Sequence, residues 1–171
     1  MKKILIAIVS FLVAVVLFMP KVNLFYTLEE LLKKEHVEIV VDSIKDRWID
    51  LVLKDATVFY DKIESVKAKE IDIKPWLVYN VIEAKDITMA KGLQSILNFK
   101  IDEAKISHSI LHYKSLNIEA SGDFGSLSGE VDLLKRSVHI LLQPTRRFER
   151  SQVARDYFKK SKEGLIYESK F

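Results

Sequence analysis

Two histidines four residues apart, His108 and His112, come closest in this sequence to a metal or catalytic motif. Imidazoles at this spacing share one face of a strand or helix and supply half of a zinc site. No further ligands are obvious, because the 171-residue chain has no cysteine and only Asp102 and Glu103 offer carboxylates nearby. We therefore expect two partly exposed sheet histidines, no bound metal and no other cofactor.

The same segment lacks the parts of a catalytic site. Ser107 and Ser109 flank His108, but residues adjacent in sequence do not form a triad. Asp102 and Glu103 would point to opposite faces of a strand, so they cannot act together as acid and base. Glycine-rich phosphate loops, the GxSxG elbow and the HExxH motif are absent from the sequence. We expect a protein that is not an enzyme.

Basic residues gather in the tail, residues 145–163, where Val153, Ala154, Tyr157 and Phe158 form an apolar stripe at helical spacing. The pattern predicts one basic amphipathic helix. Its cations would contact anionic lipid headgroups or lipopolysaccharide phosphates, or else form the solvated face of a helix packed on the sheet. A nucleic-acid partner is not expected, since the sheet lacks the aromatic pattern of RNA-binding modules. The candidate surface residues are Arg146, Arg147, Arg150, Arg155, Lys159 and Lys160.

The longest apolar run lies near the start, over residues 4–19, where Ser10 is the only polar residue. Two lysines precede it, as in a secretory n-region, but no small residue suited to signal cleavage occurs between Ala14 and Thr27. We expect an uncleaved transmembrane anchor; a cleaved signal or a buried core helix is the alternative. The expected anchor and interface residues are Lys3, Phe11, Phe18, Pro20, Lys21, Phe25 and Tyr26.

The anchor is expected to cover residues 1–26. Sixteen residues of helix span only about 24 Å, so a ~30 Å hydrocarbon core calls for an extension through Tyr26, with a kink at Pro20 and Lys21 reaching the interface. The basic N-terminus would remain in the cytoplasm, which places the bulk of the chain in the periplasm, outside the inner membrane. Thr27 and Glu30 have the spacing of a capping box, which predicts a second helix over residues 27–34.

From residue 37 onwards the apolar period changes to two, in many short runs with charged breaks. This pattern predicts an α+β, mostly antiparallel β domain over residues 27–171: a curved, extended sheet with one apolar face. Segments 51–60, 80–90, 99–109 and 116–122 echo one another, each with an acidic residue close to an alanine. Residues 120–131 predict a hairpin, residues 75–82 and 92–97 short helical or irregular inserts, and residues 165–171 a closing strand.

The order of these segments resembles the type II secretion system protein N family. The resemblance rests on PKVNLFYTLEELLKKEHVEI, LKDATVFY, SGDFGSLSGEVDLLKRSVHILLQP and GLIYESKF. More loosely, the chain is similar to the AsmA-like β-repeat proteins of the Gram-negative envelope. The first resemblance implies a single-pass inner-membrane protein accessory to secretion or envelope assembly, with secretion-system or envelope proteins as partners. The second implies a lipid-binding or lipid-transfer module with an apolar groove.

Charge divides the chain more sharply than the net value of +3 indicates. Residues 22–134 carry 14 cations against 20 acidic residues, whereas residues 135–171 carry 10 cations against 4. A basic tail therefore follows an acidic β domain, which suggests that the tail faces a surface or partner that the domain does not.

Overall fold

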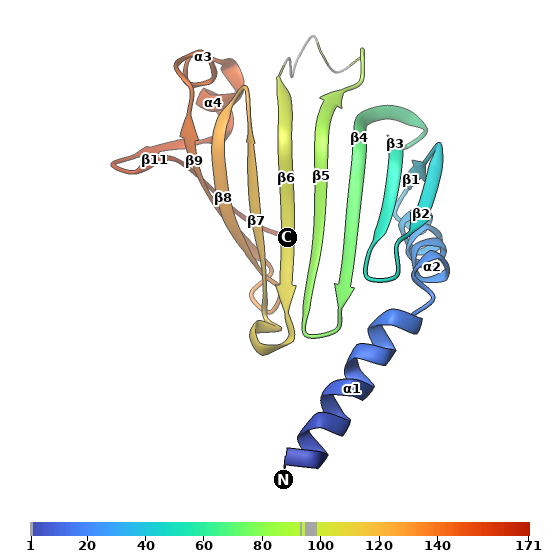
Figure 1. Cartoon of the computed structure of the whole chain (residues 1–171). Helices are drawn as coiled ribbons and strands as arrows, with labels where there is room; N and C mark the ends of the chain where they lie inside the picture. Colours follow the sequence, from blue (N-terminus) through green and yellow to red (C-terminus); the bar gives the residue numbers. More distant parts are fainter. Residues whose placement is uncertain (1, 93, 95–98) are drawn as a thin grey trace.

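The computed structural model describes residues 2–92, 94 and 99–171. Two helices precede a large sheet, and two short helices lie near its far end (Figure 1). The helices are α1 (Lys2–Phe18), α2 (Lys21–Lys34), α3 (Arg146–Glu149), α4 (Gln152–Tyr157) and the 3-10 turn η1 (Ile110–His112). The strands are β1 (Val37–Val40), β2 (Ser43–Asp46), β3 (Leu51–Tyr60), β4 (Ile63–Trp76), β5 (Tyr79–Met89), β6 (Lys100–Ser109), β7 (Ser115–Gly122), β8 (Gly125–Asp132), β9 (Ser137–Pro144), β10 (Lys159–Ser161) and β11 (Gly164–Lys170).

Among the described residues, all eleven strands belong to one antiparallel sheet with the order β1-β3-β4-β5-β6-β7-β8-β9-β11-β10, and β2 also pairs with β3. Consecutive strands from β3 to β9 are joined as hairpins, so neighbours in sequence are neighbours in space. The sheet is curved, and β9 and β11 turn behind β7 and β8 in Figure 1. The predicted mostly antiparallel α+β fold is confirmed, as are the hairpin over residues 120–131 and a closing strand at the C-terminus.

A row of backbone irregularities crosses β3 to β6. The ladder skips the pairs 55–69 and 86–102, and Asp55 and Asp86 adopt left-handed backbone conformations, with φ of 50° and 51°. Aspartate tolerates this region better than most residues. The kink reverses the alternation of side chains between the two faces of the sheet. Apolar side chains before and after the kink therefore lie on the same face. Asp55, the acidic residue beside the alanine of the first echoing segment, thus marks a bend of the sheet, and in the second segment the bend lies at Asp86, two residues after Ala84.

The first helix ends earlier than the expected anchor does. The chain bends by 64° between α1 and α2, and α2 begins at Lys21 behind Pro20. Phe25 is 4% exposed and packs against Leu51 and Leu53 of the sheet, so it does not continue an anchor helix. Residues 21–26 are apolar enough either to extend a membrane anchor or to pack on the sheet. In the structure they pack against β3.

The predicted helix start at Thr27 is wrong. Thr27 lies within α2, where its hydroxyl donates to the carbonyl of Asn23 at 3.0 Å. The expected insert after Pro75 is also wrong, because Pro75 and Trp76 end β4 and Tyr79 begins β5 after a tight turn. The short helix expected over residues 92–97 falls mostly outside the described residues.

The predicted single helix over residues 145–163 is wrong as well. The hydroxyl of Thr145 caps α3 by accepting from Phe148 N, and that of Ser151 caps α4 by accepting from Ala154 N. Two caps six residues apart divide the segment into two short helices. Lys159 and Lys160 lie on β10 instead, paired with β11.

Candidate functional site

One face of the sheet is apolar from end to end. Directly paired residues of antiparallel strands share a face, so the register identifies this surface. One row runs from Leu53 through Ile71, Ala84, Ala104, Ala120, Leu127 and Leu142 to Leu165. The row next to it runs from Leu51 through Ile73, Ile82, Ile106 and Ile118 to Gly129 and Ile140.

In the described part of the chain, helices cover only the two ends of this apolar face. At one end Phe25 of α2 packs on Leu51 and Leu53. At the other end Phe148 of α3 and Ala154 of α4 form a cluster with Phe124, Leu142 and Leu165. Edge-to-face contacts join the aromatic rings there: the centroid of Phe148 lies 5.9 Å from that of Phe99 and 6.2 Å from those of Phe124 and Phe158.

Between these two clusters the apolar face is open. Ile82 on β5 is 37% exposed and its partner Ile106 on β6 is 41% exposed, although both lie in the middle of the sheet. Isoleucine in the centre of a sheet is ordinarily buried, because covering it is the main source of folding free energy. Among the described residues, no helix packs on this stretch.

The floor of the open stretch is made of small side chains. Ala84, Ala104 and Ala120 pair in register across β5, β6 and β7, with the larger Ile82 and Ile106 beside them. On the other side of the alanines, Ile87 pairs with Ile101. A line of methyl groups therefore runs across the strands between two lines of larger side chains. We call this open stretch the alanine trough.

The alanine trough crosses three strands. From β5 to β7 there are two inter-strand steps, which amount to about 10 Å at ~4.8 Å each. Half of a ~30 Å hydrocarbon core, the depth that one acyl chain occupies, is about 15 Å. The trough is therefore suited by chemistry to a hydrocarbon chain and matches about two thirds of its length.

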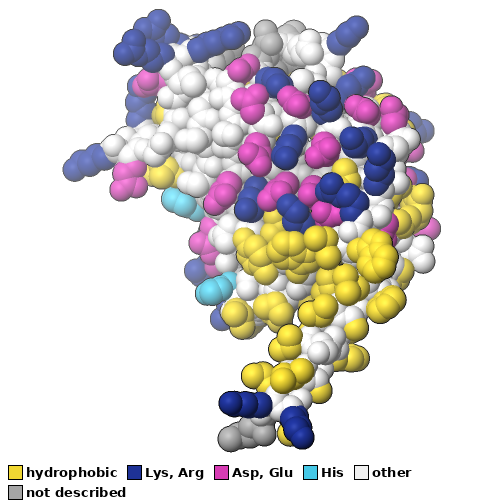
Figure 2. Space-filling model, viewed as in Figure 1, with side chains coloured by type: hydrophobic (Ala, Val, Ile, Leu, Met, Phe, Trp, Pro, Cys, Tyr) yellow, Lys and Arg dark blue, Asp and Glu magenta, His cyan; other side chains and the backbone are white. Residues whose placement is uncertain are grey.

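The opposite face of the same strands is charged, as Figure 2 shows for the upper part of the molecule. Lys74 donates to Glu83, and Lys105 lies 3.7 Å from the same carboxylate. Hydrogen bonding to Lys74 holds the pKa of Glu83 below its usual value, and the same contact raises the pKa of Lys74. Asp72 joins this network through Lys74, 3.4 Å away. Charged side chains therefore dominate this face, although Val52 and Val81 are buried on it.

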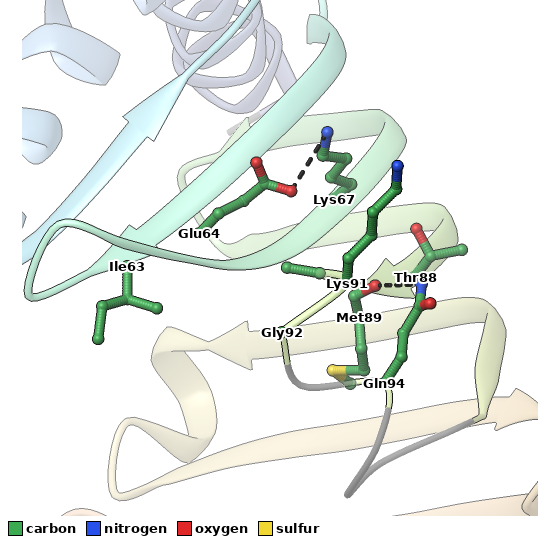
Figure 3. A pocket seen from close by; sticks show the side chains of 9 residues that line it. Ile63, Glu64, Lys67, Thr88, Met89, Lys91, Gly92 and Gln94 are labelled. Carbon is green, nitrogen blue, oxygen red and sulfur yellow. Dashed lines mark hydrogen bonds and ion pairs between the residues drawn. The ribbon is translucent and has the colours of Figure 1, made fainter.

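Another hollow, of about 510 Å³, lies beside the ends of β4 and β5 (Figure 3). Part of its polar lining is engaged with neighbours: Lys67 lies 3.2 Å from Glu64, and the amide of Gln94 donates to the carbonyl of Met89 at 3.0 Å. Its described lining contains no histidine, and no nucleophile is paired with a base. This hollow offers no arrangement for catalysis.

The two histidines, His108 and His112, lie on different elements. His108 lies on β6, half-buried, with Nε2 3.5 Å from the carbonyl of Tyr113, whereas His112 is exposed in η1. Ser107 is buried and the hydroxyl of Ser109 accepts from Leu111 N, so neither serine is paired with an imidazole. In the part of the chain that the structure describes, no three His, Asp or Glu side chains converge as metal ligands.

The expected anchor residues fall into two groups. Lys3, Phe11 and Phe18 are exposed on α1, which buries none of its residues. Lys21 and Phe25 are buried on α2, where Lys21 Nζ lies 3.6 Å from an Asp46 oxygen, while Pro20 and Tyr26 are exposed. In the described part of the chain, no single helix has the length and apolarity of a membrane span; α1 and α2 meet that test only as a bent pair.

The six candidate cations of the tail are all exposed. They lie near the end of the sheet away from α1, because α3 and α4 follow the end of β9 that pairs with Gly125 of the upper turn. Lys160 is engaged with Glu149, at 3.0 Å. The structure therefore brings these residues together and separates them from α1 by the length of the strands.

No family model, curated protein or solved structure matches this chain significantly. The site must accordingly be judged from its own geometry. Sequence reasoning predicted an apolar sheet face, and the AsmA-like resemblance implied an apolar groove, but neither identified the row of alanines. The sequence did contain a signal for this row. In three of the four echoing segments the alanine pairs with the alanine of the neighbouring strand: Ala84, Ala104 and Ala120.

Proposed function

We propose that this protein is a non-enzymatic, membrane-anchored β domain that binds the hydrocarbon chain of a lipid in its alanine trough. The single observation that carries the proposal is the open apolar stretch in the middle of the sheet, where Ile82 and Ile106 remain more than a third exposed. Leaving such a surface in water is unfavourable by roughly 25 cal/mol for each Å². A ligand that covers it removes this cost.

The anchor in this proposal is α1, with the N-terminus in the cytoplasm and the sheet in the periplasm. Its support is composition and exposure: α1 is apolar on every side and buries none of its residues. A membrane is the environment in which such a helix is stable. An alkaline phosphatase fused after Phe171 should be active in a Gram-negative host, and an inactive fusion would reverse the orientation.

A second candidate function is supported by the sequence resemblance to type II secretion system protein N. In that case the apolar face would bind a segment of a secretion-system or envelope protein, and the domain would serve as an accessory scaffold. The open stretch supports this candidate too, because an apolar peptide can cover it. The two candidates differ in what occupies the trough.

Native mass spectrometry of the full chain, released from a mild detergent, tests the lipid proposal. The wild-type protein should retain lipid, whereas Ile82→Glu/Ile106→Glu should lose at least nine-tenths of it, because two carboxylates would have to be buried against hydrocarbon. The matched control is Ser121→Glu/Ser128→Glu, which adds the same charge to exposed positions on the other face of β7 and β8. Equal lipid in both variants would contradict the proposal.

A further inference from the structure

The end of the sheet nearest α1 carries a band of exposed apolar side chains. The turns after β2, β4, β6 and β8 all lie at this end, as the pairing of Trp76 with Tyr79 and of Tyr79 with Ser109 requires. We call its most exposed members, together with Trp76, the apolar rim: Trp48 (71% exposed), Trp76, Leu111 (78%), Tyr113 (60%) and Leu134 (65%). In Figure 2 apolar side chains gather at this lower end, above α1.

The apolar rim is a fixed surface, because hydrogen bonds join each turn to the next. Trp76 Nε1 donates to the carbonyl of Ile49 at 3.0 Å, which ties β4 to the turn after β2. Ile110 N donates to Val78 O at 3.0 Å, and Leu133 N donates to Lys114 O at 2.7 Å. These bonds connect four successive turns, so their side chains present one continuous edge.

The opposite end of the sheet has a different character. Its turns carry Asp61, Lys62 and Asp123, and the basic tail lies beside them. Phe124 and Phe148 there are buried in the core cluster, and Tyr60, Ile63 and Tyr157 are exposed. The described residues of the two ends therefore differ in composition: one combines charged turns and the basic tail with three exposed apolar side chains, and the other exposes two tryptophans, a tyrosine and two leucines.

We propose that the apolar rim docks into the interface of the bilayer that α1 enters. Tryptophan and tyrosine concentrate at this depth because one part of each ring system is apolar and another donates hydrogen bonds. The contact between Lys21 and Asp46 holds the start of α2 against β2, next to the rim. The inference rests on the proposed anchor, since α1 and the rim must meet the same membrane.

This docking gives the alanine trough access to the membrane. Ile82 is three residues from Tyr79 along β5, about 10 Å from the rim. On this face the paired Asn80 and His108 lie between the rim and the isoleucines, so an acyl chain leaving the bilayer would pass one polar pair before it reaches the trough. The rim thereby connects the proposed lipid site to the source of its ligand.

The two tryptophans of the chain are both on the apolar rim, so intrinsic fluorescence reports on it without a label. The full chain is reconstituted into phosphatidylcholine–phosphatidylglycerol vesicles whose acyl chains do or do not carry bromine. Docking predicts that brominated lipid quenches at least half of the emission. Leu111→Ser/Tyr113→Ser/Leu134→Ser keeps both tryptophans and should at least halve the quenching.

Tyr60→Ser/Ile63→Ser/Tyr157→Ser, which changes three exposed apolar residues at the other end, should retain wild-type quenching and is the matched control. Ile82→Glu/Ile106→Glu should also retain it, which separates rim contact from lipid held in the trough. A chain that floats with the vesicles but shows no quenching overturns the docking alone. A chain that does not float overturns the anchor together with the docking.

Discussion

Aspartates within strands determine how this sheet bends. Asp55 and Asp86 adopt positive φ in the middle of β3 and β5, where a β-branched residue would be strained. Their charged neighbours Lys54 and Lys85 point to the polar face, so apolar side chains return to the other face on both sides of the kink. The acidic residue of the echo was visible in the sequence, but its backbone conformation was not, since any antiparallel strand exposes charged residues.

Replacing Asp86 separates this backbone role from its charge. Asp86→Val should lower the free energy of unfolding by at least about 1 kcal/mol, because valine disfavours the left-handed region. Asp86→Asn should stay within about 0.5 kcal/mol of wild type, because asparagine tolerates the conformation and the pair with Lys100 is exposed. Urea denaturation of both variants measures the difference, and equal destabilisation would refute the backbone explanation.

Glu83 should make stability depend on pH. Lys74 holds the folded pKa of Glu83 below its usual value of 4.5, so the stabilisation is complete above that value and is lost as the pH falls through the lowered folded pKa. Between pH 6 and pH 3 the unfolding free energy of wild type should fall by about 1 kcal/mol more than that of Glu83→Gln. Parallel pH profiles for the two proteins would show that the pair contributes nothing.

At the scale of elements, α2 is a cover for one end of the apolar face. The sequence predicted the sheet well, because alternation of apolar residues depends on a single face being dry. It did not predict the end of α1, because Val22 and Phe25 satisfy a bilayer and a sheet equally. It also missed the division of the tail, although Thr145 and Ser151 are both helix-capping residue types.

Replacing Phe25, the residue by which α2 packs on the sheet, tests whether α2 covers this end of the apolar face. Phe25→Ala should destabilise the domain by about 3 kcal/mol, the lower end for a buried phenylalanine, because it leaves a cavity over Leu51 and Leu53. Tyr26→Ala, at the exposed neighbouring position, should cost less than about 1 kcal/mol. Similar losses in chemical denaturation would mean that α2 does not pack on the sheet.

At the scale of the whole molecule, three surfaces of different character lie at separate places. An apolar helix and rim lie at one end, a basic tail lies at the other, and one face of the sheet between them is open and apolar. The charge asymmetry was readable from the sequence, but the distance between tail and anchor was not. It depends on strands such as β5, whose eleven residues span about 35 Å.

The separation makes a prediction for the basic tail. Arg146→Glu/Arg147→Glu/Arg150→Glu should leave co-flotation of the full chain with anionic vesicles unchanged, because the proposed membrane contact is at the other end. The same variant should abolish any binding of free anionic lipid headgroups, or of a second anionic vesicle, through electrostatic repulsion. Loss of co-flotation would place the tail at the membrane that holds α1.

The central claim is that a lipid chain occupies the alanine trough. A photoreactive amino acid placed at Ile106, on the apolar face, or at its neighbour Lys105, on the charged face, distinguishes the two sides of one strand. After irradiation in native membranes and mass spectrometry of the purified chain, the account predicts a lipid adduct at position 106 and none at position 105. Equal adducts at both positions, no adduct at either, or a protein adduct at position 106 would contradict it.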